Sequence, residues 1–115
     1  MVKSILGVYH QGLRDWMIQR VSALVMAIYS VGLIVYIMLH PALTYMEWRD
    51  LIASTGMKIA TLLFLVAVIY HAWIGMWTVF TDYVKPFFIR ACLNLLVLFS
   101  LAAGFIWSVL ILWSV

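Results

Sequence analysis

The chain consists of three long apolar runs separated by short polar segments. The runs span residues 21–39, 59–81 and 91–115, and none of them contains Asp, Glu, Lys or Arg. Each run has about 19 to 25 residues, and a helix of that length crosses a hydrocarbon core of roughly 30 Å. The pattern therefore predicts three transmembrane helices, at approximately residues 20–39, 58–81 and 87–114.

The composition points to the same fold class. The 115 residues are 68% hydrophobic and 10% charged. A soluble domain of this size has too small an interior to bury so much apolar surface. We therefore expect residues 1–115 to form a single all-α membrane domain that is solvated by the lipid bilayer. Nucleic acid is not an expected partner.

The cysteine and motif content limits the chemistry that the chain itself can carry. Cys92 is the only cysteine and lies within the third run, so the chain forms no disulfide and no cysteine-held iron–sulfur cluster of its own. The sequence also contains no glycine-rich phosphate loop or dinucleotide fingerprint. Any flavin or iron–sulfur chemistry is therefore expected from partner proteins.

Positively charged residues gather on one side of the predicted spans. Five of them precede the first span or join the second span to the third, and two lie in the other loop. Because cytoplasmic loops carry the excess of Lys and Arg, we predict a cytoplasmic N-terminus and a periplasmic C-terminus. The five are Lys3, Arg14, Arg20, Lys85 and Arg90, and the two are Arg49 and Lys58.

Turn and capping residues mark the ends of the predicted helices. Pro41 ends the first helix because proline disfavours helical conformation in the residue before it. Ser54 or Thr55 is suited to cap the second helix, and Pro86 suits the first turn of the third. The outer loop, residues 41–56, is expected to be a surface turn or a short amphipathic helix at the interface.

Small residues recur at helical spacing in the third run. Ser100, Gly104 and Ser108 follow one another at every fourth position, a pattern that allows a second helix to approach closely. Three helices make only a partial bundle. We therefore expect the chain to be part of a heteromeric helix bundle with a second membrane chain.

His71 is the histidine that lies deep within an apolar run, whereas His10 and His40 are expected to be solvated residues at the interfaces. Ala67 and Gly75 precede and follow His71 by four residues, on the same helical face. These small neighbours predict a shallow slot in which a flat macrocycle reaches the imidazole. The alternative is that the histidine hydrogen-bonds to a neighbouring helix and the small residues allow close packing. Ionisable residues inside a membrane are functional candidates by default.

A second polar group lies where the second run leaves the membrane. Tyr83 follows His71 by twelve residues, which is about 18 Å along a helix, so His71 is expected near mid-bilayer and Tyr83 at the surface. Asp82 is expected to cap the turn or to support chemistry at Tyr83. Arg20, expected at the depth of these two residues, is either a snorkelling anchor or a partner for an acidic group.

Residues 71–77 (HAWIGMW) and 81–86 (TDYVKP) closely resemble the small hydrophobic membrane anchor, or D subunit, of bacterial succinate dehydrogenase. The resemblance implies that His71 is an axial ligand of a haem b shared with a cytochrome b subunit, and that Tyr83 lines a ubiquinone site. In that arrangement Arg20 is a candidate contact to the haem propionates or the quinone site. Asp82 is a candidate support for the quinone site.

The resemblance also implies an assembly and a location. Succinate is expected to be oxidised on a flavoprotein subunit, with electrons passing through an iron–sulfur subunit to ubiquinone in a respiratory complex of the bacterial inner membrane. The chain by itself is expected to be non-catalytic. The alternatives are the anchor of a fumarate reductase, which can lack haem, and a purely structural docking subunit. A small transporter is disfavoured because the second run contains no acidic residue.

Overall fold

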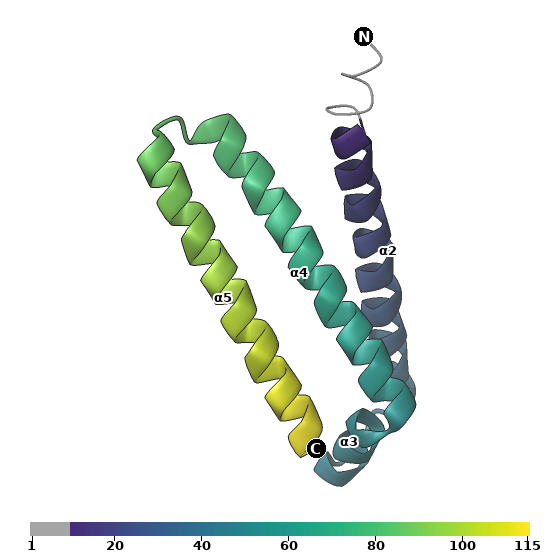
Figure 1. The fold of residues 1–115 in the computed structure, drawn as a ribbon. Coiled ribbons are helices and arrows are strands. Elements are labelled where there is room, and N and C mark those ends of the chain that lie inside the picture. Colours follow the sequence, from purple (N-terminus) through teal and green to yellow (C-terminus); the bar gives the residue numbers. More distant parts are fainter. Residues whose placement is uncertain (1–9) are drawn as a thin grey trace.

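The computed structural model describes residues 10–115, and side chains from Gly12 onward. This part of the chain forms, in order, α2 (His10–Leu39), α3 (Tyr45–Ala53), α4 (Thr55–Tyr83) and α5 (Phe87–Ser114), as shown in Figure 1. The expectations for the side chains of Lys3 and His10 lie outside the described residues. Helices α2, α4 and α5 are long and apolar enough to cross a membrane, which confirms the predicted all-helical fold with three candidate spans.

Helix α2 begins at His10, ten positions before the expected start of the first span. The first span was expected to start at about residue 20, next to the start of the apolar run, but the described residues before it are helical as well. No proline interrupts residues 12–19, and half of them (Leu13, Arg14, Met17 and Gln19) are good helix formers. The first helix therefore extends beyond its apolar run by more than two turns.

The helix boundaries follow the capping residues that the sequence indicated. Helix α2 ends at Leu39, two residues before Pro41. The Ser54 side chain accepts a hydrogen bond from the Met57 backbone N–H and is the N-cap of α4. Pro86 is the N-cap of α5 rather than a residue of its first turn.

The outer loop contains the short helix α3, one of the two forms expected for it. Thr44 and Glu47 form a reciprocal capping box at its start, in which each side chain accepts a hydrogen bond from the backbone N–H of the other. Helix α3 contacts α4 and α5 at the end of the molecule where the chain terminates (Figure 1).

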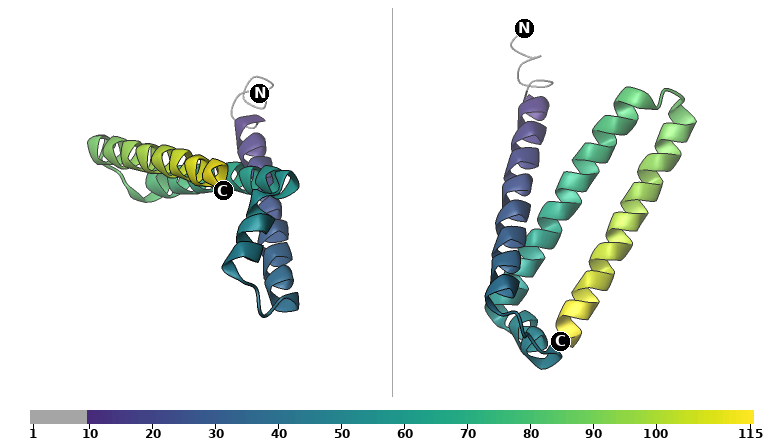
Figure 2. Two further views of the ribbon diagram at one scale, coloured as in Figure 1. Left: turned by 90° about the horizontal axis from the view of Figure 1, so that it is seen from below. Right: turned by 180° about the vertical axis from the view of Figure 1, so that it is seen from behind.

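Helix α4 is the centre of the fold. It packs against α2 on one side and α5 on another, and within residues 10–115 α2 and α5 do not pack against each other. Figure 2 shows this open arrangement from below and behind, with α4 and α5 side by side and α2 set apart from α5. The described N-terminal part and the C-terminus lie at opposite ends of the molecule, as three passes of one chain require (Figure 1).

The described chain has almost no interior of its own. In the most apolar 18-residue segment of each long helix, only 6% of the residues are buried. Apolar side chains facing outward are stable in lipid, where they lose nothing by exposure to other hydrocarbon. The buried residues of the described part are Ser22, Ala67, Phe80 and Leu112.

Within residues 10–115, no other helix packs against the small-residue seam of α5, formed by Ser100, Gly104 and Ser108. Ser100 and Gly104 are exposed, and a Cβ atom placed on Gly104 would meet no atom within 4 Å. The Ser108 hydroxyl donates to the Gly104 carbonyl of its own helix at 2.8 Å. The seam is thus open to another helix.

Candidate functional site

The imidazole of His71 lies at the interface between α4 and α2. Its Nδ1 atom is 3.1 Å from the hydroxyl oxygen of Ser22, which belongs to α2 and is 3% exposed. The His71 side chain itself is half-buried, and its Nε2 atom has no hydrogen-bond partner among the residues that the structure describes. One ring nitrogen thus has a structural partner, as the alternative interpretation expected, while the other is free.

Helix α2 covers the face of α4 on which the slot beside His71 was predicted. Ala67 is 8% exposed in the α2–α4 contact. A Cβ atom placed on Gly75 would lie 3.5 Å from Nε2 of Gln19, which is on α2. The expectation of an open slot for a macrocycle was therefore wrong for this face. Small side chains at these two positions allow α2 to approach α4 closely.

We expect Ala67→Leu to lower the thermal stability of the purified complex. The longer side chain has no room between α2 and α4, and overpacking of this kind costs about 1–3 kcal/mol. Gly75→Ala should be tolerated, because 3.5 Å is an ordinary contact distance. Ala42→Leu, at an exposed position between α2 and α3, is a control for added bulk. Equal unfolding temperatures for the Ala67 and Ala42 variants would contradict this account of the interface.

Contacts along α2 and α4 fix their antiparallel register. The Tyr29 hydroxyl lies 2.8 Å from the Thr61 hydroxyl, and the Tyr29 ring stacks on Phe64 with a centroid distance of 4.5 Å. Toward the other end of the interface, Ser22 pairs with His71. Two residues of α2 therefore form side-chain hydrogen bonds to α4: Tyr29 to Thr61, and Ser22, near the centre of α2, to His71.

This register corrects the expected depth of Arg20. Arg20 lies near the level of Ile74, and Asp82 lies eight positions further along α4, about 12 Å closer to the helix end. Two residues of helix also turn Arg20 by about 200° from Ser22, away from α4. Its exposed guanidinium lies over the Trp16 ring, 5.6 Å from the centroid. This placement favours the anchor interpretation of Arg20.

Tyr83 is the last residue of α4, and its side chain is 80% exposed. Twelve helical residues place it about 18 Å from His71 along the axis and about a third of a turn around it. The two side chains therefore leave α4 in different directions. Asp82 is exposed and forms no cap with the described residues: Val84 closes α4 through its backbone N–H. The expected capping role of Asp82 is thus not observed.

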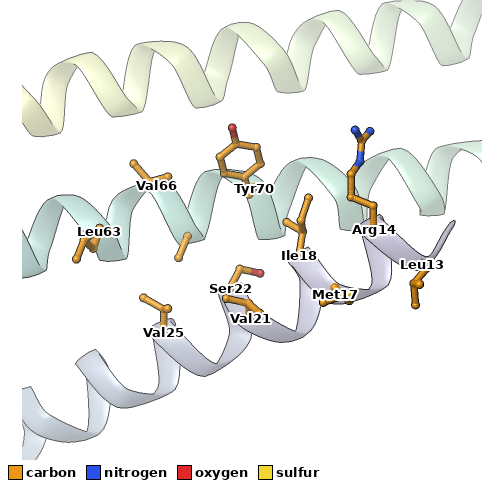
Figure 3. Close-up of a pocket in the computed structure, with 11 residues that line it drawn as sticks. Leu13, Arg14, Met17, Ile18, Val21, Ser22, Val25, Leu63, Val66 and Tyr70 are labelled. Atoms are coloured by element: carbon orange, nitrogen blue, oxygen red, sulfur yellow. The ribbon is translucent and has the colours of Figure 1, made fainter. Parts of the chain in front are cut away.

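An open crevice of about 540 Å³ runs beside the Ser22–His71 contact. Figure 3 shows its walls, which are almost entirely apolar side chains of α2 and α4; Arg14, Ser22 and Tyr70 also line it. A second crevice of about 510 Å³ shares Arg14 and Tyr70 and adds the rings of Trp73 and Trp77.

Arg14 is a basic residue that sequence reasoning counted only as a topology charge. The structure brings it, rather than Arg20, to the space between α2 and α4. Its spacing of eight residues from the buried Ser22 is close to two helical turns. That spacing could have predicted that Arg14 lies near the face of α2 that contains Ser22. It identifies a site only once this face is known to pack on α4.

The donor set of the described chain suits a prosthetic group better than a bare metal ion. Among the described residues, no three His, Cys, Asp or Glu side chains come close enough to hold a metal ion. A haem iron already has four ligands from its porphyrin and needs only axial ligands from protein. The His71 imidazole, whose Nε2 atom has no hydrogen-bond partner among the described residues, fits the role of one such protein ligand.

Comparison with known proteins adds two findings. The sequence model of the family described as succinate dehydrogenase/fumarate reductase transmembrane subunit matches residues 2–112. A relative from Coxiella burnetii (strain RSA 493 / Nine Mile phase I), named succinate dehydrogenase hydrophobic membrane anchor subunit, is 45% identical over 103 residues. The alignment covers 90% of this chain and 90% of the relative.

Proposed function

The chain belongs to the family of succinate dehydrogenase and fumarate reductase transmembrane subunits, and from this premise we propose that it holds one haem b ligand and part of a ubiquinone site. The observation that carries this proposal is His71, whose Nδ1 atom is engaged by Ser22 while Nε2 has no hydrogen-bond partner among the described residues. As a membrane anchor, the chain works together with the other subunits of its complex.

In the proposed complex, the His71 imidazole would hold the haem iron together with a second ligand from a cytochrome b subunit. The described chain offers no second imidazole at that depth, since His40 lies just beyond the end of α2. When bound, haem b supplies a one-electron redox centre within the membrane. The role of this chain is to hold the imidazole in a fixed orientation and, with its apolar helices, to keep water away from it.

Tyr83 is the proposed quinone contact. Reduction of a quinone takes two electrons and two protons, so the site must lie near water while the isoprenoid tail stays in lipid. An exposed phenol at the end of α4 meets both conditions, and its O–H donates a hydrogen bond to a quinone carbonyl. Asp82 beside it is free to support this site, because it forms no cap in the described part of the chain.

The proposal includes an orientation and a set of partners. The charge asymmetry supports a cytoplasmic N-terminus and a cytoplasmic α4–α5 turn in a bacterial inner membrane. A flavoprotein subunit and an iron–sulfur subunit then dock on the side where Tyr83 lies, and succinate oxidation takes place on the flavoprotein. The open seam of α5 and the scarcity of buried residues support a heteromeric helix bundle.

Purification through an affinity tag on this chain tests the proposal. We expect the cytochrome b, iron–sulfur and flavoprotein subunits to co-purify, and the reduced-minus-oxidised spectrum to contain a b-type band. An isolated, monodisperse chain would contradict the assembly. A complete complex without the b-type band would instead favour a haem-free fumarate reductase anchor and would remove the role proposed for His71.

A further inference from the structure

The hydroxyl group of Ser22 is the most buried polar side chain in the described part of the protein. Ser22 is 3% exposed and faces α4 from the middle of α2. A hydroxyl withdrawn from water costs about 1–3 kcal/mol unless it is hydrogen-bonded. The partners of this hydroxyl therefore determine what it contributes.

Two contacts of hydrogen-bond length converge on the Ser22 oxygen. It lies 3.0 Å from the backbone carbonyl oxygen of Gln19 and 3.1 Å from Nδ1 of His71. A carbonyl oxygen only accepts, so the single hydroxyl proton of Ser22 is donated to Gln19. The remaining contact is satisfied only when His71 donates its Nδ1–H to the serine oxygen. In the neutral imidazole, Nε2 is then the nitrogen with a free lone pair.

From this arrangement we infer that Ser22 is a positioning residue that fixes the tautomer of His71 and thereby selects Nε2 as the iron-binding nitrogen. The inference rests on the haem role proposed above for His71. A hydrogen bond accepted from the non-ligating N–H of a metal-bound histidine sets the orientation of the ring and raises the basicity of the ligating nitrogen. Ser22 thus acts on the iron through His71 without touching it.

A second close approach between α2 and α4 lies one turn away from this contact. Gln19, one turn from Ser22, lies against Gly75, one turn from His71, at the 3.5 Å separation described above. Its Oε1 atom is buried and has no hydrogen-bond partner among the described residues. A side chain larger than alanine at position 75 would therefore displace the end of the Gln19 side chain first.

Substitutions at Ser22 in the assembled complex test the inference. Ser22→Ala removes the acceptor, Ser22→Cys replaces it by a weak acceptor of similar shape, and Ser22→Thr keeps a hydroxyl. Ser30→Ala, elsewhere on α2, is the matched control. The measurements are the haem midpoint potential, the electron paramagnetic resonance spectrum of the oxidised haem, and the haem retained per complex.

We expect the Ala and Cys variants to shift the midpoint potential upward, because a less basic imidazole stabilises the oxidised iron less well. They should also retain haem about 10- to 100-fold less tightly, the usual range for loss of such an outer partner. The Thr and Ser30→Ala variants should behave like the wild type. Wild-type potential and resonance spectrum in both the Ala and Cys variants would overturn the inference, as would an equal shift in the Thr variant.

The outcome separates this inference from the function on which it rests. If the wild-type complex contains no haem b, or if His71→Ala keeps it, the proposed function fails before Ser22 is considered. If haem is present and depends on His71 but is unaffected by loss of the Ser22 acceptor, only the positioning role of Ser22 fails.

Discussion

Replacing His71 with alanine is expected to abolish the b-type absorption band of the purified complex. Loss of an outer partner of a metal-bound histidine already costs about 10- to 100-fold in affinity, so loss of the ligand itself should leave less than about a tenth of the haem. The affected quantity is haem per complex, measured from the reduced-minus-oxidised spectrum after affinity purification. Co-purification of the partner subunits shows whether assembly survives.

His40→Ala is the matched control for this experiment. His40 is exposed, and its Nδ1–H donates to the Tyr36 carbonyl at 3.0 Å, within its own segment of chain. The control variant should retain full haem content. A His71→Ala complex with an undiminished b-type band would mean that the iron is held entirely by other chains, and this chain would then be only a tether.

Replacing Tyr83 with phenylalanine should slow quinone reduction while haem content stays the same. The change removes one hydroxyl and keeps the ring. A lost hydrogen bond of about 0.5–1.5 kcal/mol corresponds to a roughly 2- to 13-fold loss of rate, and more if the phenol also transfers protons. The measurement is succinate-driven reduction of a short-chain ubiquinone by the purified complex.

Two comparisons make the Tyr83 result interpretable. Tyr45→Phe removes a hydroxyl from a similarly exposed tyrosine on α3, at the other end of the molecule, and should have no effect. Electron transfer from succinate to a water-soluble dye should also be unchanged in both variants, because it bypasses the membrane site. Parallel losses of dye and quinone reduction would place the defect in the soluble subunits instead.

The sequence predicts the spans well because their signal is local. Absence of charge over 19 or more residues has few explanations other than lipid, and Ser54 caps the helix that follows it, as expected. The motifs at 71–77 and 81–86 predicted the family, which the comparisons confirm. Both inferences depend on residues that are close together in the chain.

Features that depend on the rotation and register of two helices were not predictable. The partner of His71 is Ser22, 49 positions away. A series of small residues on α4 does not indicate which helix will pack against that face. The predicted slot was wrong for this reason: α2 of the same chain covers that face of α4. The depth of Arg20 was misjudged because helix α2 continues past the apolar run to His10, so the first polar residue is not the helix end.

The continuity of α4 from Thr55 to Tyr83 has a consequence for the spacing of the two proposed sites. Because His71 and Tyr83 lie on one unbroken helix, repacking of α2 or α5 leaves the axial distance between the imidazole and the phenol unchanged. One alanine inserted after Thr78 would advance Tyr83 by about 1.5 Å and swing it through about 100°, so orientation rather than reach would be lost first.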